Sequence, residues 1–284
     1  MTRAVTRAVT RAVTSERVDS FRTRWREEAK RTGLNPRDVD LLLADALQRS
    51  PSYLISHGEE VFDPSQIEAL LARRLAGEPL QYIRGRSEFY GREFLVDDRV
   101  LIPRPETELL VETVLLRAPR HASVVDVGTG SGCIAVTLER ERPDLRVLAT
   151  DRSLASLAVA RQNARRLQSR IQFVASDVLT GLRNAFDVVV SNPPYIPAAD
   201  VELLDREVRA HEPRSALTPG VRGTEMIERI FDSCGASLVV LEIGYGQEAA
   251  VRIAAEARQI AVMEVRNDFA GIPRVVVSSG HGWK

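Results

Sequence analysis

The tetrapeptide Asn192-Pro193-Pro194-Tyr195 follows the apolar run 186–191 and limits how that run can fold. Neither proline has an N–H group for a strand ladder, so a central strand must end there. In open α/β sheets, ligands bind at the carboxyl ends of the strands. We therefore expect a site with two acceptors, the Asn192 side-chain oxygen and the Pro193 carbonyl, beside the Tyr195 ring. A planar NH2 group fits such a site, although a rigid turn that ends a strand would also explain the sequence.

A glycine-rich loop follows a second apolar run, at 124–132. The run reads Val-Val-Asp-Val-Gly-Thr-Gly-Ser-Gly, and a helical pattern begins at Cys133. Alternating glycines permit a tight turn and a close backbone approach to a ligand at a helix N-terminus. The spacing is one residue tighter than the G-x-G-x-x-G of dinucleotide folds. The loop predicts a cofactor site, although such a loop alone is also found in plain turns.

Acidic residues follow the next two expected strands. Asp151 ends the strand 146–150, and Ser176-Asp177 follows the strand 171–175. An acid at the end of the second strand can accept hydrogen bonds from both hydroxyls of a ribose, and Asp177 can accept from an adenine amino group. Asp151 also fits a helix N-cap. NAD is a rival cofactor, but it leaves the Asn-Pro-Pro-Tyr site unexplained.

Together these motifs resemble the amino-methylating branch of S-adenosylmethionine-dependent methyltransferases. The segments 77–85, 89–91 and 101–108 are similar to those of the peptide chain release factor glutamine N5-methyltransferases (PrmC/HemK type). The third segment, Leu-Ile-Pro-Arg-Pro-Glu-Thr-Glu, is the most specific; a sister enzyme that acts on a ribosomal-protein glutamine has Pro-Arg-Ser-Pro where this chain has Pro-Arg-Pro-Glu. The resemblance covers about residues 16–284.

The resemblance implies a reaction and its site residues. It implies methyl transfer from S-adenosylmethionine, with S-adenosylhomocysteine as product, to the side-chain nitrogen of the glutamine in the Gly-Gly-Gln motif of a release factor. The cofactor residues would be Asp126, Gly128, Thr129, Gly130, Ser131, Gly132, Asp151, Asp177, Val178 and Asn192. Relatives often carry a bulkier or aromatic residue at the position of Val178, near the adenine. The catalytic and substrate-binding residues would be Asn192, Pro193, Pro194 and Tyr195, with Arg104 and Glu106 also at the substrate.

The chain composition bounds the alternatives. The 39 Lys and Arg residues balance 39 Asp and Glu residues, which weighs against a chain that binds polyanions nonspecifically. Two cysteines make neither a metal set nor a disulfide framework, and we expect no metal. There is no apolar run of 18 residues and no signal-peptide pattern, so we expect a cytoplasmic protein without a membrane partner or a direct nucleic-acid substrate.

The hydrophobic patterns predict an α/β protein with four parts. Residues 1–14 repeat Thr-Arg-Ala-Val and are expected to be a disordered tail, and 15–85 have the pattern of a helical bundle of four or five helices that recognises the substrate protein. Residues 86–103 predict a β-hairpin linker. In 104–284, strands alternate with helices as in a doubly wound parallel sheet; the resemblance implies seven strands, with the last one antiparallel. A methyltransferase for another ribosomal-protein glutamine, or for adenine or cytosine in DNA or RNA, and a non-catalytic binding protein remain alternatives.

Overall fold

The computed structural model describes residues 15–182, 186–233 and 235–279. The chain forms two compact units, one up to Arg84 and one from Gly85 onward. The predicted repeat tail at 1–14 and the second cysteine, Cys234, lie outside the described residues. Within those residues, no helix combines the length and the apolar character that crossing a membrane requires.

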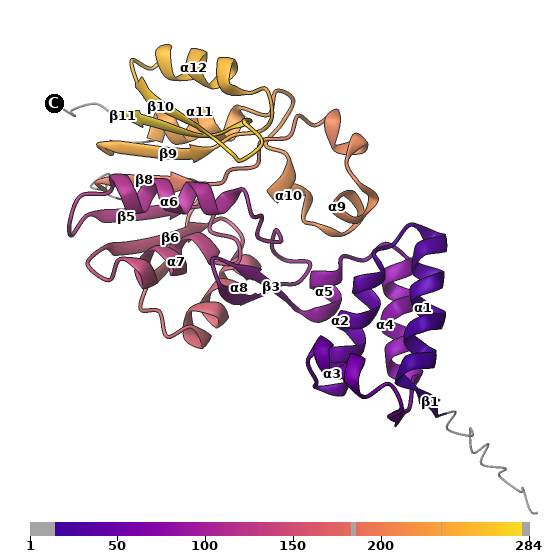
Figure 1. The fold of residues 1–284 in the computed structure, drawn as a ribbon. Coiled ribbons are helices and arrows are strands. Elements are labelled where there is room, and N and C mark those ends of the chain that lie inside the picture. Colours follow the sequence, from indigo (N-terminus) through magenta and orange to yellow (C-terminus); the bar gives the residue numbers. More distant parts are fainter. Residues whose placement is uncertain (1–14, 183–185, 234, 280–284) are drawn as a thin grey trace, which may run out of the picture. The chain divides into compact units, whose positions relative to one another are not determined.

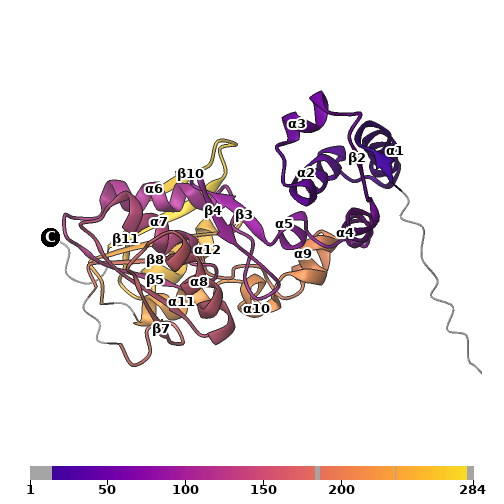
Figure 2. The ribbon, with the colours of Figure 1, turned by 90° about the horizontal axis from the view of Figure 1, so that it is seen from below.

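The first unit is helical. Its helices are α1 (Val18–Thr32), α2 (Pro36–Leu47), α3 (Pro51–Ser56), α4 (Ser65–Leu75) and α5 (Leu80–Arg84), and two short strands, β1 (Glu16–Arg17) and β2 (Val61–Phe62), pair antiparallel. Both α1 and α4 are seen end-on in Figure 2, and Arg24 of α1 bonds Glu68 of α4 at 2.9 Å. Proline begins α2 and α3, where a missing N–H costs nothing.

The core of the first unit includes one buried ion pair. Phe21, Leu43 and Leu54 are fully buried there. Arg74 on α4 donates to Asp38 on α2 at 2.7 Å, and both side chains are about one-tenth exposed. This pair joins the second and fourth helices beneath the surface.

The second unit begins with a hairpin. Strands β3 (Arg86–Phe89) and β4 (Arg92–Leu95) pair antiparallel. The fully buried Asn163 accepts from the Leu95 N–H at 2.7 Å and donates to the Leu95 carbonyl at 2.9 Å and the Ser131 carbonyl at 2.9 Å. One amide therefore fastens the hairpin to the glycine-rich loop.

A seven-stranded sheet forms the centre of the second unit, and its order is β10-β11-β9-β8-β5-β6-β7 (Figure 1). Strand β11 is antiparallel to both neighbours, and the five strands from β9 to β7 are parallel. This confirms the predicted fold, including the reversed last strand. The strands are β5 (Ser123–Val127), β6 (Arg146–Asp151), β7 (Gln172–Ala175), β8 (Val188–Ser191), β9 (Leu238–Glu242), β10 (Ala261–Asn267) and β11 (Pro273–Ser279).

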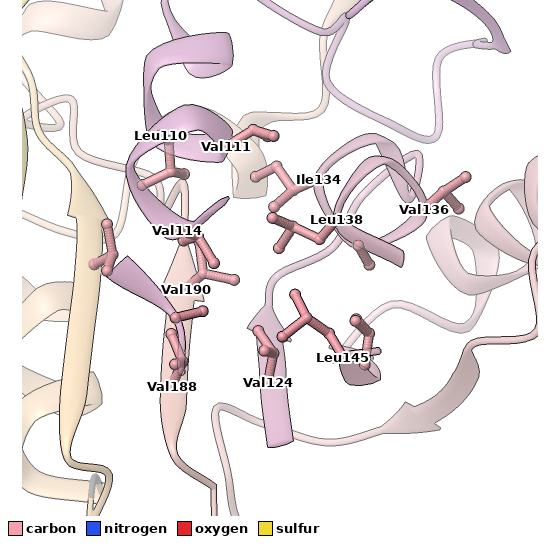
Figure 3. Close-up of a cluster of buried hydrophobic side chains, with 14 of the residues drawn as sticks. Leu110, Val111, Val114, Val124, Ile134, Val136, Leu138, Leu145, Val188 and Val190 are labelled. Atoms are coloured by element: carbon pink, nitrogen blue, oxygen red, sulfur yellow. The ribbon is translucent and has the colours of Figure 1, made fainter. Parts of the chain in front are cut away.

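Helices cover both faces of this sheet. Because side chains alternate along a strand, Val124, Val188 and Val190 face one way, and Val125 and Val189 face the other. The first set packs under α6 (Thr107–Arg117) and α7 (Cys133–Glu141), as Figure 3 shows. The second set packs under α11 (Glu225–Ser233) and α12 (Glu248–Glu256). The remaining helices are α8 (Leu154–Arg166), the 3-10 turn η1 (Asp200–Leu203), α9 (Arg206–His211) and α10 (Arg214–Leu217).

Candidate active site

A cavity of about 410 Å³ lies at the carboxyl ends of four adjacent parallel strands. Gly128 and Gly130 line it after β5, Asp151 at the end of β6, Asp177 after β7, and Asn192 after β8. This volume is within the range of small-molecule sites. The structure thus gathers, in one cavity, residues that the sequence separates by 64 positions.

In the glycine-rich loop, the backbone N–H groups of residues 128–130 are not free to bind a ligand in the cavity. Gly128, Gly130 and Gly132 have φ angles of 75°, 55° and 83°. A Cβ at Gly132 would lie 3.2 Å from the Ala160 Cβ of α8, which is a tight contact that also favours glycine there. The N–H groups of residues 128 and 129 bond the Thr150 carbonyl, and that of Gly130 bonds Asp151. Since these donors are used internally, the loop is poorly suited to a dinucleotide pyrophosphate, which relies on such N–H groups.

Asp126 lies beneath the loop and does not line the cavity. It is fully buried and accepts from the Thr129 hydroxyl at 2.6 Å. Burial raises the pKa of this carboxyl to about 7, against the hydrogen bond from Thr129. Thr129, Ser131 and Gly132 likewise do not line the cavity. Asp126 therefore braces the turn from within the fold, and a direct contact of these four with a ligand stays a prediction.

Asp151 lines the cavity as a braced carboxylate. One oxygen accepts from the Gly130 N–H at 3.0 Å and the other from the Ser153 N–H at 2.8 Å. The N-cap of α8 is Ser153 and not Asp151, since the Ser153 side chain accepts from the Ser156 N–H. Each carboxylate oxygen accepts more than one hydrogen bond, so Asp151 keeps capacity for a ligand.

Asp177 and Val178 form the next part of the wall. Asp177 is about half exposed and pairs with Arg229 of α11 at 2.6 Å. Val178 is buried, has a φ of 56° and lines the cavity with Met226. The wall is therefore acidic at Asp177 and apolar beside it, which suits a flat heterocycle with an exocyclic amino group.

The Asn192-Pro-Pro-Tyr195 segment is held from several sides. The Asn192 Nδ2 group donates to the Thr107 hydroxyl at 3.0 Å. Among the described residues, none donates a hydrogen bond to the Asn192 Oδ1 or the Pro193 carbonyl. The Gln247 side chain donates to the Tyr195 carbonyl at 2.7 Å and accepts from the Gly244 N–H at 2.8 Å. The two predicted acceptor oxygens are thus unused by the protein.

Two ionisable residues, Tyr195 and Glu242, contact each other at this segment. The Tyr195 hydroxyl donates to Glu242 at 3.5 Å, and Glu242 is only 1% exposed. Burial, followed by the nearby Glu242 charge, raises the pKa of Tyr195. Burial also raises the pKa of Glu242 to about 7, although the Thr107 hydroxyl and the Arg274 charge lower it. Asn192 and Pro194 line the cavity, whereas Pro193 and Tyr195 do not, and a ligand contact by these two stays a prediction.

An ion pair outside the cavity lining joins two distant segments. Arg104 donates to the buried Glu212 at 2.5 Å, and Glu212 also accepts from the Ile102 N–H at 3.4 Å. Burial raises the pKa of Glu212, and Arg104 opposes that rise. Arg104 and the exposed Glu106 do not line the cavity. A substrate contact by either stays a prediction, and the clear role of Arg104 is to tie the two segments together.

Comparison with known proteins decides the family. The PrmC N-terminal domain matches residues 23–85, and the methyltransferase small domain matches residues 105–218. A release factor glutamine methyltransferase from Burkholderia pseudomallei is 46% identical over 262 residues, covering 85% of this chain and 90% of that protein. One from Koribacter versatilis is 41% identical over 251 residues, covering 84% and 89%. The chain belongs to the release factor glutamine methyltransferase family.

This membership confirms the predicted family and the prediction that the chain is a methyltransferase. Among solved structures, this release factor glutamine methyltransferase is similar to the E. cuniculi Mtq2–Trm112 complex. The TM-score is 0.48 and the sequence identity 22%, with 64% of this chain and 99% of that chain covered.

Three residues for which the sequence predicts no role also shape the site of this methyltransferase. Thr107, Glu242 and Gln247 each touch the Asn-Pro-Pro-Tyr segment from another element. For Glu242 a signal was available, because an acid ending the apolar run 238–241 resembles Asp151 at the end of its own strand. Thr107 and Gln247 had no such signal, since a polar residue at or just before the start of a helix is common.

Proposed function

We propose that this chain transfers a methyl group from S-adenosylmethionine to the side-chain nitrogen N5 of the glutamine in the Gly-Gly-Gln motif of a peptide chain release factor. Family membership supports the substrate. The observation that carries the proposal is the Asn192 amide, whose nitrogen is held by Thr107 while its oxygen is unused. That arrangement offers an acceptor to an incoming NH2 group.

The residues of the cavity fit S-adenosylmethionine. Asp151 would hold the ribose hydroxyls, Asp177 the adenine amino group, and Val178 the adenine face, with the loop at 128–130 against the remainder. The cofactor has no phosphate, in keeping with a loop whose N–H groups are used internally. When bound, S-adenosylmethionine supplies a methyl group already activated by its positive sulfur, so we propose no metal.

The chain's own residues act on the glutamine nitrogen. That nitrogen is a poor nucleophile because its lone pair is conjugated with the carbonyl. As it attacks, its hydrogens gain positive charge, and the Asn192 Oδ1 and Pro193 carbonyl hold them more strongly. The methylated nitrogen becomes neutral again when one of these protons leaves for the solvent. Acceptors that are fixed beforehand need no reorganisation during the reaction. Holding the amide in line with the methyl group also removes the entropy of a chance encounter.

We propose that the first unit recognises the release factor. Every residue that lines the cavity lies at position 99 or beyond, so the first unit is not needed to form the cofactor site. It is also the part that matches the PrmC N-terminal domain. A cytoplasmic location, where release factors act, stays part of the proposal.

Mass spectrometry of a purified release factor tests the function. After incubation with the enzyme and S-adenosylmethionine, we expect one added methyl group on the Gly-Gly-Gln glutamine. The matched control is a release factor with that glutamine changed to alanine, which should stay unmodified. Methylation of a different residue, or none with an enzyme that binds S-adenosylhomocysteine, would contradict the proposed substrate.

A further inference from the structure

The loops that follow β8, β9 and β10 expose large apolar side chains. All three loops leave the sheet at its carboxyl edge, because these strands point the same way. The exposed side chains include Val221 after β8 (81%), Tyr245 after β9 (79%) and Phe269 after β10, which is fully exposed. One exposed apolar residue is ordinary. Three of them on neighbouring loops, at the edge that carries Asn192, mark a surface that we call the apolar rim.

Tyr245 is held at the tip of a tight turn. The Gln247 N–H donates to the Gly244 carbonyl at 3.2 Å, and Gly246 has a φ of 76°, as such a turn demands of glycine. The Gln247 side chain then fastens the turn to the Tyr195 carbonyl at 2.7 Å. The Tyr245 ring is therefore presented to solvent directly beside the Asn-Pro-Pro-Tyr segment.

Phe269 lies in a second built turn, next to the loop of Tyr245. The Ile243 N–H, just after β9, donates to the Arg274 carbonyl at 2.8 Å, so the start of β11 lies beside the end of β9. The Arg274 side chain pairs with Asp268 at 3.0 Å, and Asp268 also accepts from the Ile272 N–H at 3.0 Å. These bonds close the turn from 268 to 272 and leave the Phe269 ring outside it.

The position of the acceptor site says what would cover the rim. This inference rests on the proposed function. A glutamine whose amide lies at the Asn192 Oδ1 must belong to a polypeptide that leaves the site over neighbouring loops. The cofactor cavity occupies the carboxyl ends of β5, β6 and β7. The other neighbours of β8 at this edge are the loops of the rim, so the polypeptide passes over them.

The charges on these loops fit a protein better than a nucleic acid. Arg222, next to Val221, pairs with Glu228 at 3.0 Å, and Arg274 pairs with Asp268. Binding of nucleic acid depends on cations that neutralise phosphates, and these two arginines already have carboxylate partners. The centres of protein interfaces are instead depleted in charge and enriched in aromatic residues.

We propose that Tyr245 and Phe269, with Val221, bind the part of the release factor that flanks the target glutamine. Exposed aromatic rings on fixed turns lose little conformational entropy when they are covered, and such anchors carry much of the binding energy of an interface. None of the three residues lines the cavity. They therefore determine how tightly the protein substrate binds, and the chemistry is left to the residues in the cavity.

Steady-state kinetics of two alanine variants test the proposal. In Tyr245→Ala and in Phe269→Ala, we expect KM for the release factor to rise about tenfold, while kcat and the affinity for S-adenosylhomocysteine change little. Tyr245→Phe keeps the ring and should resemble wild type. The midpoint of urea unfolding should not move, because the side chains are exposed. An unchanged KM in both alanine variants would overturn the proposal.

Leu116→Ala is the matched control. Leu116 is 71% exposed near the end of α6, which leads into the amino end of β5 at the opposite edge of the sheet. This variant also loses an exposed apolar side chain, and its KM should stay at the wild-type value. An equal rise in KM in Leu116→Ala would show that the loss does not depend on the rim.

Binding without turnover separates this inference from the proposed function. With S-adenosylhomocysteine in place of the methyl donor, calorimetry of the release factor should give a Kd about tenfold higher for Tyr245→Ala than for wild type. A wild type that binds the release factor but does not methylate it contradicts the proposed function alone. Methylation with the same Kd in wild type and both alanine variants contradicts this inference alone. A nucleic acid that displaces the release factor from wild type, and binds Tyr245→Ala more weakly, would assign the rim to nucleic acid and overturn it.

Discussion

At the scale of single residues, the site contains acids of two kinds. Asp151 and Asp177 face the cavity. Asp126 and Glu242 are buried beside it, and burial raises the pKa of each to about 7. The cavity-facing acids can take hydrogen bonds from a ligand, whereas the buried ones shape the backbone and side chains around it.

Asp151 lines the cavity and can accept further hydrogen bonds, so we predict that Asp151→Asn loses cofactor affinity. The change keeps the size but removes the charge, so we expect a loss of about 1.5–3 kcal/mol in binding. Titration calorimetry with S-adenosylhomocysteine measures this. Asp144→Asn removes a carboxylate that pairs with Arg142 outside the cavity, and it should bind as wild type does. Equal affinity of all three proteins would mean that Asp151 only braces the loop.

The acceptor role of Asn192 predicts a loss of turnover without a loss of cofactor binding. Asn192→Ala should lower kcat roughly 100-fold or more, as removal of one preorganised hydrogen bond does. The loop at 128–132 is untouched, so the affinity for S-adenosylhomocysteine should stay near that of wild type. Steady-state kinetics and calorimetry on the same preparation provide the two values. If turnover survives, Asn192 does not hold the nucleophile.

The buried Glu242 predicts a pH-dependent stability difference. Its folded pKa of about 7 lies above its ordinary 4.5, so the protonated form favours the fold, and this stabilisation is lost as the pH rises from 4.5 to 7. The free energy of unfolding of Glu242→Gln, taken relative to that of wild type, should therefore rise by about 2–3 kcal/mol from pH 5 to pH 8. The charged or titratable groups that act on Glu242 are Arg274, Glu106, Tyr195 and Cys133.

Urea unfolding of the two proteins at both pH values measures this difference. Asp126 titrates with the same sign but is present in both proteins, so it cancels in the comparison. A difference in unfolding free energy that does not vary with pH would mean that Glu242 titrates at its ordinary value.

At the scale of elements, the cavity depends on ties between segments that are remote in sequence. Arg104, just before α6, bonds Glu212, just after α9, across 108 positions. Gln247, just before α12, bonds the Tyr195 carbonyl. Gly244 has no room for a side chain, because a Cβ there would lie 2.9 Å from the Tyr195 ring. The loops after β8 and β9 are thus packed against each other.

The ion pair between Arg104 and Glu212 predicts a larger loss of stability when Arg104 alone is replaced than when both residues are replaced. Glu212 has a buried side chain, while that of Arg104 is 33% exposed. Arg104→Gln leaves a buried charge without its partner, and we expect it to lower the free energy of unfolding by about 1–3 kcal/mol, reduced from the fully buried case by exposure to solvent. Urea unfolding measures the loss. The double variant Arg104→Gln, Glu212→Gln should recover part of it, and no recovery would show that the charge is not the cause.

At the scale of the whole molecule, the balance of charge bears on the substrate. The formal net charge at pH 7 is zero, so no overall attraction draws the chain to a polyanion. The acceptor site would admit an adenine or cytosine amino group as readily as a glutamine, and the pocket chemistry alone does not separate them.

This charge balance predicts methyl transfer to a release factor and none to duplex DNA. Labelled S-adenosylmethionine should mark the release factor at any ordinary salt concentration. The demanding condition for DNA is low salt, where phosphate contacts bind most strongly. Scintillation counting of both substrates at low salt compares them directly. Label in DNA but not in the release factor would overturn the assignment.

The sequence by itself determined the fold, the family and the position of three residues that line the cavity. Strand ends are readable because apolar runs, glycines and prolines are local signals, and parallel strands bring their carboxyl ends to one edge. Asp151, Asp177 and Asn192 were placed at that edge from such signals, and the structure sets all three in one cavity.

Only the tertiary structure decided which hydrogen-bond partners from distant segments surround the site and which of its acids are buried. Thr107 reaches Asn192 from 85 positions away, and Glu242 reaches Tyr195 from 47. Burial likewise separates Asp126, beneath the loop, from Asp151, facing the cavity, although both are acids at strand ends. The physical reason is that a hydrogen-bond partner and the exposure of an acid depend on which elements pack together, and no local pattern along the chain records that packing.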